Sequence, residues 1–121
     1  MARVIHFDFT AEDLQRAISF YEKAFGWKFK KWEGPMDYWL ITTGPEGEPG
    51  IDGGLSKREN GAGFTNTIGV SSVDEAAKKV IDAGGKVIRP KVAIPGAGYF
   101  ALCEDTEGNQ FGLMEDNPEA R

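Results

Sequence analysis

The residues best suited to chemistry lie close to the amino terminus, where His6 and Asp8 alternate with Ile5, Phe7 and Phe9. This period of two is typical of a strand with one buried face, so the imidazole and the carboxylate project together from the other face. An unperturbed histidine titrates at about pH 6.5 and suits acid–base work. His6 is therefore our candidate catalytic or ligand-contacting group, and a hydrogen-bonded structural histidine is the alternative. Asp8 is a candidate ligand contact or a solvated capping carboxylate.

The chain of 121 residues has one histidine and one cysteine, and these counts limit metal chemistry. A lone His6 excludes a multi-histidine zinc or iron site, an HExxH helix and a two-histidine facial triad within one chain. Cys103 can form neither an intrachain disulfide nor a cysteine-rich cluster. Its place in a strand, between Leu102 and Glu104, favours a packed residue over a nucleophile.

The charge balance and the absence of long apolar stretches limit the partners. Nineteen acidic and fourteen basic residues give a net charge of −5, and the pI is near 4.9. This charge opposes the phosphate backbone, so we expect no nucleic-acid partner. The start of the chain lacks the apolar region of a secretory signal, and no stretch approaches the roughly 20 apolar residues that span a bilayer. We expect a cytoplasmic protein without membrane attachment.

One order of elements, a strand, a helix and three strands, occurs twice along the chain. Apolar residues recur three and four apart in the helices and alternate in the strands, and glycines end both helices. The predicted elements are a strand around 5–10, a helix that ends at 25, strands at 27–33, 37–43 and about 51–57, then a strand at 64–70, a helix at 73–83 and strands at about 86–94, 98–104 and 110–115.

Two capping signals set the predicted helix starts. Thr10 can cap the first helix, with Asp13 three residues on as a shortened capping-box partner, and Ser72 with Glu75 forms an S-x-x-E box before the second helix. The acceptor side chain of each signal can satisfy the free N–H groups of the first helical turn.

Several residues of the two halves match at an offset of about 61 residues, which indicates a duplicated unit rather than a stacked array. The matches include His6 with Thr67, Phe9 with Val70, Tyr38 with Tyr99, and Trp39 with Phe100. A half of roughly 55 residues is marginal on its own. We therefore expect the halves, about 1–58 and 63–116, to share one core in a single domain over residues 1–121.

Four motifs in this order give the whole chain a family resemblance. They are VIHFDF, DLQRAISFYEKAFGWKF, TIGVSSVDEA and EDTEGNQFGLME. Together they resemble the vicinal oxygen chelate superfamily, the glyoxalase/bleomycin-resistance/extradiol-dioxygenase group, and Gly-Gly-Leu at 53–55 resembles a branch related to lactoylglutathione lyase. The resemblance implies an α+β fold in which two βαβββ modules form a curled mixed sheet around a concave pocket, with the helices on the outer face.

The resemblance also implies where a metal would be held in catalytic members, by a first-strand histidine and a last-strand carboxylate from each module. His6 matches the first of these four ligands. The second histidine falls on Thr67, and the carboxylates fall on Gly53 or Gly54 and on Gly112. Three of four ligands are missing, so we predict no metal and no other cofactor.

Glycines and aromatic residues point to an organic ligand instead. A Gly53-Gly54 pair inside a strand commonly marks a bulge or a close approach by a ligand or another backbone. Aromatic residues are frequent in the predicted strands and can line a pocket, or else serve core packing and subunit contacts; they are Trp27, Trp32, Tyr38, Trp39 and Tyr99. The run Lys28, Lys30 and Lys31 is typical of a solvated strand edge.

The hypothesis that follows is metal-independent binding of a small organic molecule, of the bleomycin-resistance type, by a homodimer. The predicted ligand contacts are His6, Asp8, Tyr38, Gly53, Gly54, Thr67, Tyr99 and Gly112. The alternative is a glyoxalase-related lyase or isomerase that uses His6 as acid and base or a non-standard site for zinc, nickel, manganese or iron. A third possibility, an accessory module with a protein interface, predicts no enclosed pocket.

Overall fold

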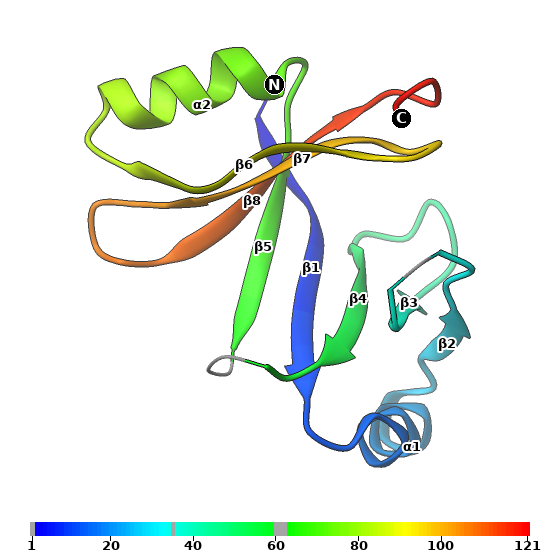
Figure 1. Ribbon diagram of the computed structural model, residues 1–121. Coiled ribbons are helices and arrows are strands. Elements are labelled where there is room, and N and C mark those ends of the chain that lie inside the picture. Colours follow the sequence, from blue (N-terminus) through cyan, green and yellow to red (C-terminus); the bar gives the residue numbers. More distant parts are fainter. Residues whose placement is uncertain (1, 35, 60–62) are drawn as a thin grey trace. The chain divides into compact units, whose positions relative to one another are not determined.

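A computed structural model describes residues 2–34, 36–59 and 63–121. These residues form two compact units, which we call the first unit, His6–Phe64, and the second unit, Thr65–Arg121 with the segment that ends at Ile5. The described residues contain eight strands and two helices, so the predicted α+β class is confirmed (Figure 1). The organisation as a single domain stays a prediction.

The first unit has the predicted order of strand, helix and three strands. Its sheet order is β2-β3-β4-β1, in which β1 and β4 are parallel and the other neighbours are antiparallel. The bounds are β1 Arg3–Ala11, α1 Leu14–Phe25, β2 Lys28–Lys31, β3 Tyr38–Thr42 and β4 Asp52–Lys57 (Figure 1, blue to green). The two parallel strands require the crossover that α1 and the hairpin provide.

The second unit repeats this topology with the order β5-β8-β7-β6, again with its first and last strands parallel. The bounds are β5 Phe64–Gly69, α2 Val73–Asp82, β6 Lys86–Ile94, β7 Gly98–Glu104 and β8 Gln110–Asp116 (Figure 1, green to red). The duplication predicted from the sequence is therefore confirmed at the level of secondary structure.

Each unit has its own apolar core between its helix and its sheet. In the first unit, Phe9, Ile18, Ile41 and Leu55 are buried together. In the second unit, the buried residues are Val73, Ala101, Cys103 and Leu113. Cys103 is fully buried, and burial raises the pKa of its thiol, which agrees with the predicted packing role.

The helix starts confirm one capping prediction and correct the other. Ser72 Oγ accepts a hydrogen bond from the Glu75 N–H at 3.1 Å, as predicted. The first helix is capped by Asp13, whose carboxylate accepts from the Arg16 N–H at 3.0 Å, and not by Thr10. Thr10 belongs to β1, which continues to Ala11, because its pairing with β4 extends the strand past the predicted end.

Two further predictions concern the exposure of strand side chains. The sequence predicts that Ile5 is on the buried face of its strand, but it belongs to the second unit, is 44% exposed and lies beside Gly69. The predicted lysine edge is confirmed: β2 is the last strand of its unit's sheet, and Lys28, Lys30 and Lys31 are exposed.

Neither α1 nor α2, the helices of the described segments, is long and apolar enough to cross a membrane.

Replacement of the Asp13 cap tests the corrected helix start. We expect Asp13→Ala to lower the free energy of unfolding by about 1 kcal/mol, because the Arg16 N–H loses its acceptor. Urea unfolding followed by circular dichroism measures this change. Asp13→Asn keeps a capping oxygen and serves as the matched control, with an expected change of a few tenths of a kcal/mol. Equal losses in both variants would contradict the capping role.

Candidate functional site

The strand register places the predicted polar residues of the first unit on one face of its sheet. His6 is paired with Asp52, Asp8 with Gly54, and Gly54 in turn with Leu40. Paired residues of neighbouring strands project to the same side. Because the alternate residues of β1 pack in the core under α1, this second face, which we call the His6 face, points away from the core.

Three side chains of the His6 face form a hydrogen-bonded cluster. The Tyr38 hydroxyl donates to Asp8 Oδ1 over 2.5 Å, and His6 Nε2 lies 2.9 Å from the same hydroxyl oxygen. His6 Nε2 is also 3.4 Å from Asp8 Oδ1. The side chains of His6 and Asp8 are both about one-third exposed, so the cluster is half-buried rather than sealed.

The Tyr38 side chain reaches Asp8 by crossing over Gly54, which lies between them in the sheet. A Cβ atom at residue 54 would overlap the Tyr38 hydroxyl and would stand 2.7 Å from Asp8 Oδ1. Gly54 is buried, and its missing side chain is the space that the phenol fills. The glycine that the sequence suggested for a ligand's approach is thus used by the protein's own tyrosine.

Burial and the neighbouring carboxylate keep Tyr38 protonated. Loss of water around the phenol raises its pKa far above the ordinary value of 10.0, and the negative charge and hydrogen bond of Asp8 raise it further. The single hydroxyl proton is donated to Asp8, so a hydrogen bond between the phenol oxygen and His6 Nε2 requires a proton on that nitrogen. The hydrogen bonds of the cluster therefore run in one direction, from His6 as the first donor, through Tyr38, to Asp8 as the final acceptor.

Two other side chains surround this cluster. Trp32 meets the Tyr38 ring edge-to-face with 6.1 Å between ring centres. Asp52, which is next to His6 in the register, accepts from the Thr43 N–H at 2.9 Å and from the Thr43 hydroxyl at 3.2 Å. Asp52 is not among the residues predicted for the site, yet it faces the same way as His6. Only the pairing between strands could have revealed this.

The second unit has a corresponding arrangement without the charged groups. Thr67 is paired with Gly112, and a Cβ atom at Gly112 would meet the Phe100 ring at 2.6 Å and the Thr67 hydroxyl at 3.1 Å. Thr67 is 4% exposed. In both units, an aromatic ring thus lies across a glycine, next to a polar residue of the unit's first strand.

These equivalences correct the predicted alignment of the two halves. Thr67 precedes the Ser72 cap by five residues, as Asp8 precedes Asp13, so Thr67 corresponds to Asp8 rather than to His6. The ring that corresponds to Tyr38 belongs to Phe100, not to Tyr99. The shift from Tyr99 to Phe100 is one residue and reverses the face, whereas the shift from His6 to Asp8 is two residues and keeps it; the sequence offset was too coarse to resolve either.

Two predicted ligand contacts lie on the core side of their sheets. A Cβ atom at Gly53 would meet the Phe7 carbonyl oxygen at 2.5 Å and the Phe7 ring at 2.7 Å. Tyr99 packs against the core of the second unit, with the Lys91 ammonium 4.9 Å from its ring centre. The structure thus brings together His6, Asp8, Tyr38 and Gly54 on one face, and Thr67 with Gly112 in the other unit.

The donor set does not fit the four-ligand metal site that the resemblance implies. His6 keeps a donor, but its Nε2 is engaged with Tyr38, and Gly54 and Gly112 have no side-chain donor at all. Across residues 2–34, 36–59 and 63–121, no three histidine, cysteine, aspartate or glutamate side chains gather closely enough to hold a metal ion.

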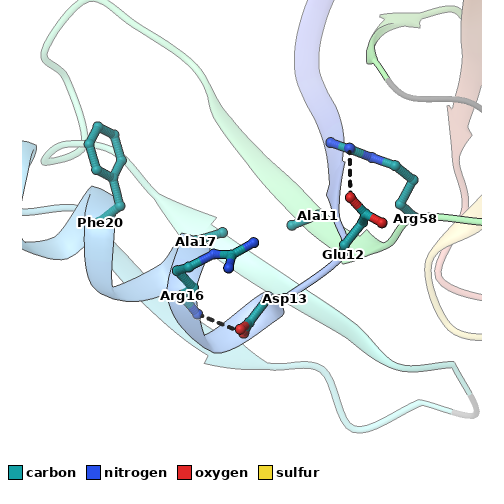
Figure 2. Close-up of a pocket in the computed structure, with 7 residues that line it drawn as sticks. All are labelled: Ala11, Glu12, Asp13, Arg16, Ala17, Phe20 and Arg58. Atoms are coloured by element: carbon teal, nitrogen blue, oxygen red, sulfur yellow. Dashed lines mark hydrogen bonds and ion pairs between the residues drawn. The ribbon is translucent and has the colours of Figure 1, made fainter.

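Two cavities lie elsewhere in the first unit. One, of about 330 Å³, lies at the start of α1 between Arg16, Phe20 and Arg58. Figure 2 shows that Glu12 pairs with Arg58 across it, at 3.8 Å, while Asp13 caps the helix. The other, of about 520 Å³, is lined by residues of the segment from Thr42 to Asp52. Neither cavity includes His6, Asp8 or Tyr38.

Comparison with known proteins identifies relatives over almost the whole chain. The family model of the Glyoxalase/Bleomycin resistance protein/Dioxygenase superfamily matches residues 3–113. Lactoylglutathione lyase of Escherichia coli O157:H7 is 28% identical over 98% of this chain and 96% of the relative. A probable chloroplastic lactoylglutathione lyase of Arabidopsis thaliana is 32% identical over 96% of this chain, which spans 36% of that relative.

Solved structures show the same fold at low sequence identity. A hypothetical protein from Bacillus halodurans C-125 superposes with a TM-score of 0.73, at 15% identity over 99% of this chain and 98% of the other. Methylmalonyl-CoA epimerase from Mycobacterium tuberculosis has a TM-score of 0.69, at 16% identity over 94% of this chain and 87% of the other. These two likenesses concern the fold alone.

The close approach of Tyr38 to Gly54 predicts that the two positions are coupled. We expect Gly54→Ala to lower the free energy of unfolding by about 1–3 kcal/mol, because the new methyl group overlaps the phenol. In a Tyr38→Ala background the same change should cost much less, and a double-mutant cycle from urea unfolding measures the difference.

Gly44→Ala is the matched control, since a Cβ atom there meets nothing closer than the Glu48 side chain at 3.9 Å. Additive effects of Gly54→Ala and Tyr38→Ala would show that the phenol does not occupy the space above Gly54.

Proposed function

The chain belongs to the Glyoxalase/Bleomycin resistance protein/Dioxygenase superfamily, and we propose that it uses the His6 face to bind a small organic molecule without a resident metal ion. The observation that carries this proposal is the position of Tyr38. Its hydroxyl fills the space above Gly54, one of the two glycines where the resemblance puts a carboxylate ligand, and it engages the one retained ligand, His6.

The surroundings of the cluster support an organic ligand. Leu40 lies on the same face and is 40% exposed, and the Trp32 ring stands beside Tyr38. Small-molecule sites in proteins typically combine apolar and aromatic walls with a few placed polar groups. His6, Asp8 and Tyr38 would supply the polar groups, while Trp32 and Leu40 would supply the apolar contact.

The remaining expectations about the ligand and the assembly are part of the same proposal. Thr67 and Gly112 stay predicted ligand contacts, and Gly53 and Tyr99 would act only indirectly, through the packing of their sheets. We also propose a cytoplasmic homodimer, a common state for soluble proteins with closed symmetry.

Metal analysis tests the proposal directly. Protein purified without chelators should contain far less than one equivalent of zinc, nickel, manganese or iron per chain by mass spectrometry of the metals, because too few donors converge. Asp74→Ala, which changes a surface carboxylate of α2, controls for loose surface binding. A tightly held metal at one equivalent per chain, lost in His6→Ala and kept in Asp74→Ala, would overturn the proposal.

A second candidate function is a lyase or isomerase, and the hydrogen-bond chain from His6 to Asp8 favours it. Three groups that can carry a proton lie within 3.4 Å of one another, and general acid–base catalysis needs such a group within hydrogen-bond reach of the substrate. The relatives named lactoylglutathione lyase support the same class. In this reading His6 and Asp8 would remove a proton from carbon beside a carbonyl group and return it to a neighbouring atom.

Turnover measurements distinguish the two functions. The second candidate predicts conversion of a hemithioacetal or a related α-hydroxycarbonyl compound, with kcat reduced about 10²–10⁴-fold in His6→Ala. Asp74→Ala, on α2 of the second unit, is the control and should leave the rate unchanged. Absence of activity against a broad panel, with and without added Ni²⁺, Zn²⁺, Mn²⁺ or Fe²⁺, would contradict this candidate and leave ligand binding as the function.

A further inference from the structure

We infer that the His6–Tyr38–Asp8 cluster offers hydrogen-bond acceptors to its ligand, so that the bound group is a donor of the ammonium or amidinium class. This inference rests on the proposed function, because it assumes that the His6 face binds an organic molecule. It adds that the ligand group in contact with the cluster is a hydrogen-bond donor, which the family resemblance does not specify.

The first step is the position of the protons. Tyr38 has one hydroxyl proton, and the 2.5 Å contact directs it to Asp8 Oδ1. The phenol oxygen can then only accept from His6, so His6 Nε2 carries a proton and points it at Tyr38 over 2.9 Å. In the neutral imidazole this assignment leaves Nδ1 without a proton, as an acceptor.

The second step is what remains for a ligand. The hydrogen bonds of His6 all involve Nε2, and among the described residues no donor is recorded at Nδ1. The His6 side chain is about one-third exposed, and in this tautomer its Nδ1 offers a ligand a lone pair rather than an N–H group. A carbonyl or carboxylate oxygen would be repelled there, whereas an N–H donor would be bound.

The third step is charge. Asp8 lies 3.4 Å from His6 Nε2, and Asp52 is the register neighbour of His6 on the adjacent strand. The lysines of β2 are three strands from β1, and strands are about 4.8 Å apart, so solvent and salt screen them from His6. Lys57, on the adjacent strand β4, is paired with Ala11 and therefore projects from the opposite face of the sheet. Two carboxylates beside the acceptor therefore favour a positively charged donor over a neutral one.

The lone histidine makes the proton assignment directly measurable. In protein labelled with ¹⁵N, the ring signals of His6 are the only imidazole signals, and long-range ¹H–¹⁵N spectra report which nitrogen carries the proton. At a pH well above the ordinary histidine pKa of about 6.5, we expect Nε2 to be protonated and Nδ1 to be bare. A proton on Nδ1 would overturn the inference without reference to any ligand.

Three probes with one aromatic body and different head groups test the ligand class. We expect benzamidine to bind at least about tenfold more tightly than benzamide or benzoate in NMR titrations, a difference of about 1.4 kcal/mol. Tighter or equal binding of benzoate or benzamide would overturn the inference and leave organic-ligand binding intact. If none of the probes binds saturably while Nε2 carries the proton, the proposed function itself fails, and the inference with it.

Matched variants assign the effect to the cluster. His6→Phe keeps a planar ring but removes the acceptor, and it should reduce benzamidine affinity about tenfold. Asp52→Asn should narrow the preference for benzamidine over benzamide, whereas Asp82→Asn, the same change on α2 of the second unit, should not. Thermal unfolding of each variant confirms that it is folded. Unchanged benzamidine affinity in folded His6→Phe would overturn the inference.

Discussion

The hydrogen bond from Tyr38 to Asp8 is the interaction on which the candidate site depends. It spans the width of β4, and it forms only because Gly54 leaves the space above that strand open. The bond fixes the proton of the phenol, and the phenol in turn fixes the proton of His6. The absence of a side chain at Gly54 thus determines which atoms of His6, Tyr38 and Asp8 donate and which accept. The reason is that a half-buried hydroxyl must place its single proton on its strongest acceptor.

The same construction recurs in the second unit with different chemistry. Phe100 lies across Gly112 beside Thr67, as Tyr38 lies across Gly54 beside Asp8. Both units keep the geometry of a ring over a glycine. The polar groups differ, since Thr67 stands in place of Asp8 and the apolar ring of Phe100 in place of Tyr38. Only the first unit therefore carries ionisable groups at this position, and the proposed function depends on that difference.

The family fold and the site chemistry follow from different parts of the sequence. The membership rests on motifs that form helices, turns and cores, which is why it extends over residues 3–113. The site rests on a few residues of β1, β3 and β4, where glycines stand at positions expected for carboxylates. Because one scaffold hosts unrelated chemistries, membership narrows the possible reactions without selecting one.

The sequence by itself determined the α+β class, the duplicated order of elements, the Ser72 cap, the packed Cys103 and the shared face of His6 and Asp8. These depend on local periodicity and short-range hydrogen bonds, which a single strand or helix already expresses. Only the tertiary structure decided that Tyr38 joins Asp8, that Asp52 neighbours His6 and that Phe100 replaces Tyr99. Those relations depend on pairing between distant strands, where a shift of one residue moves a side chain to the opposite face.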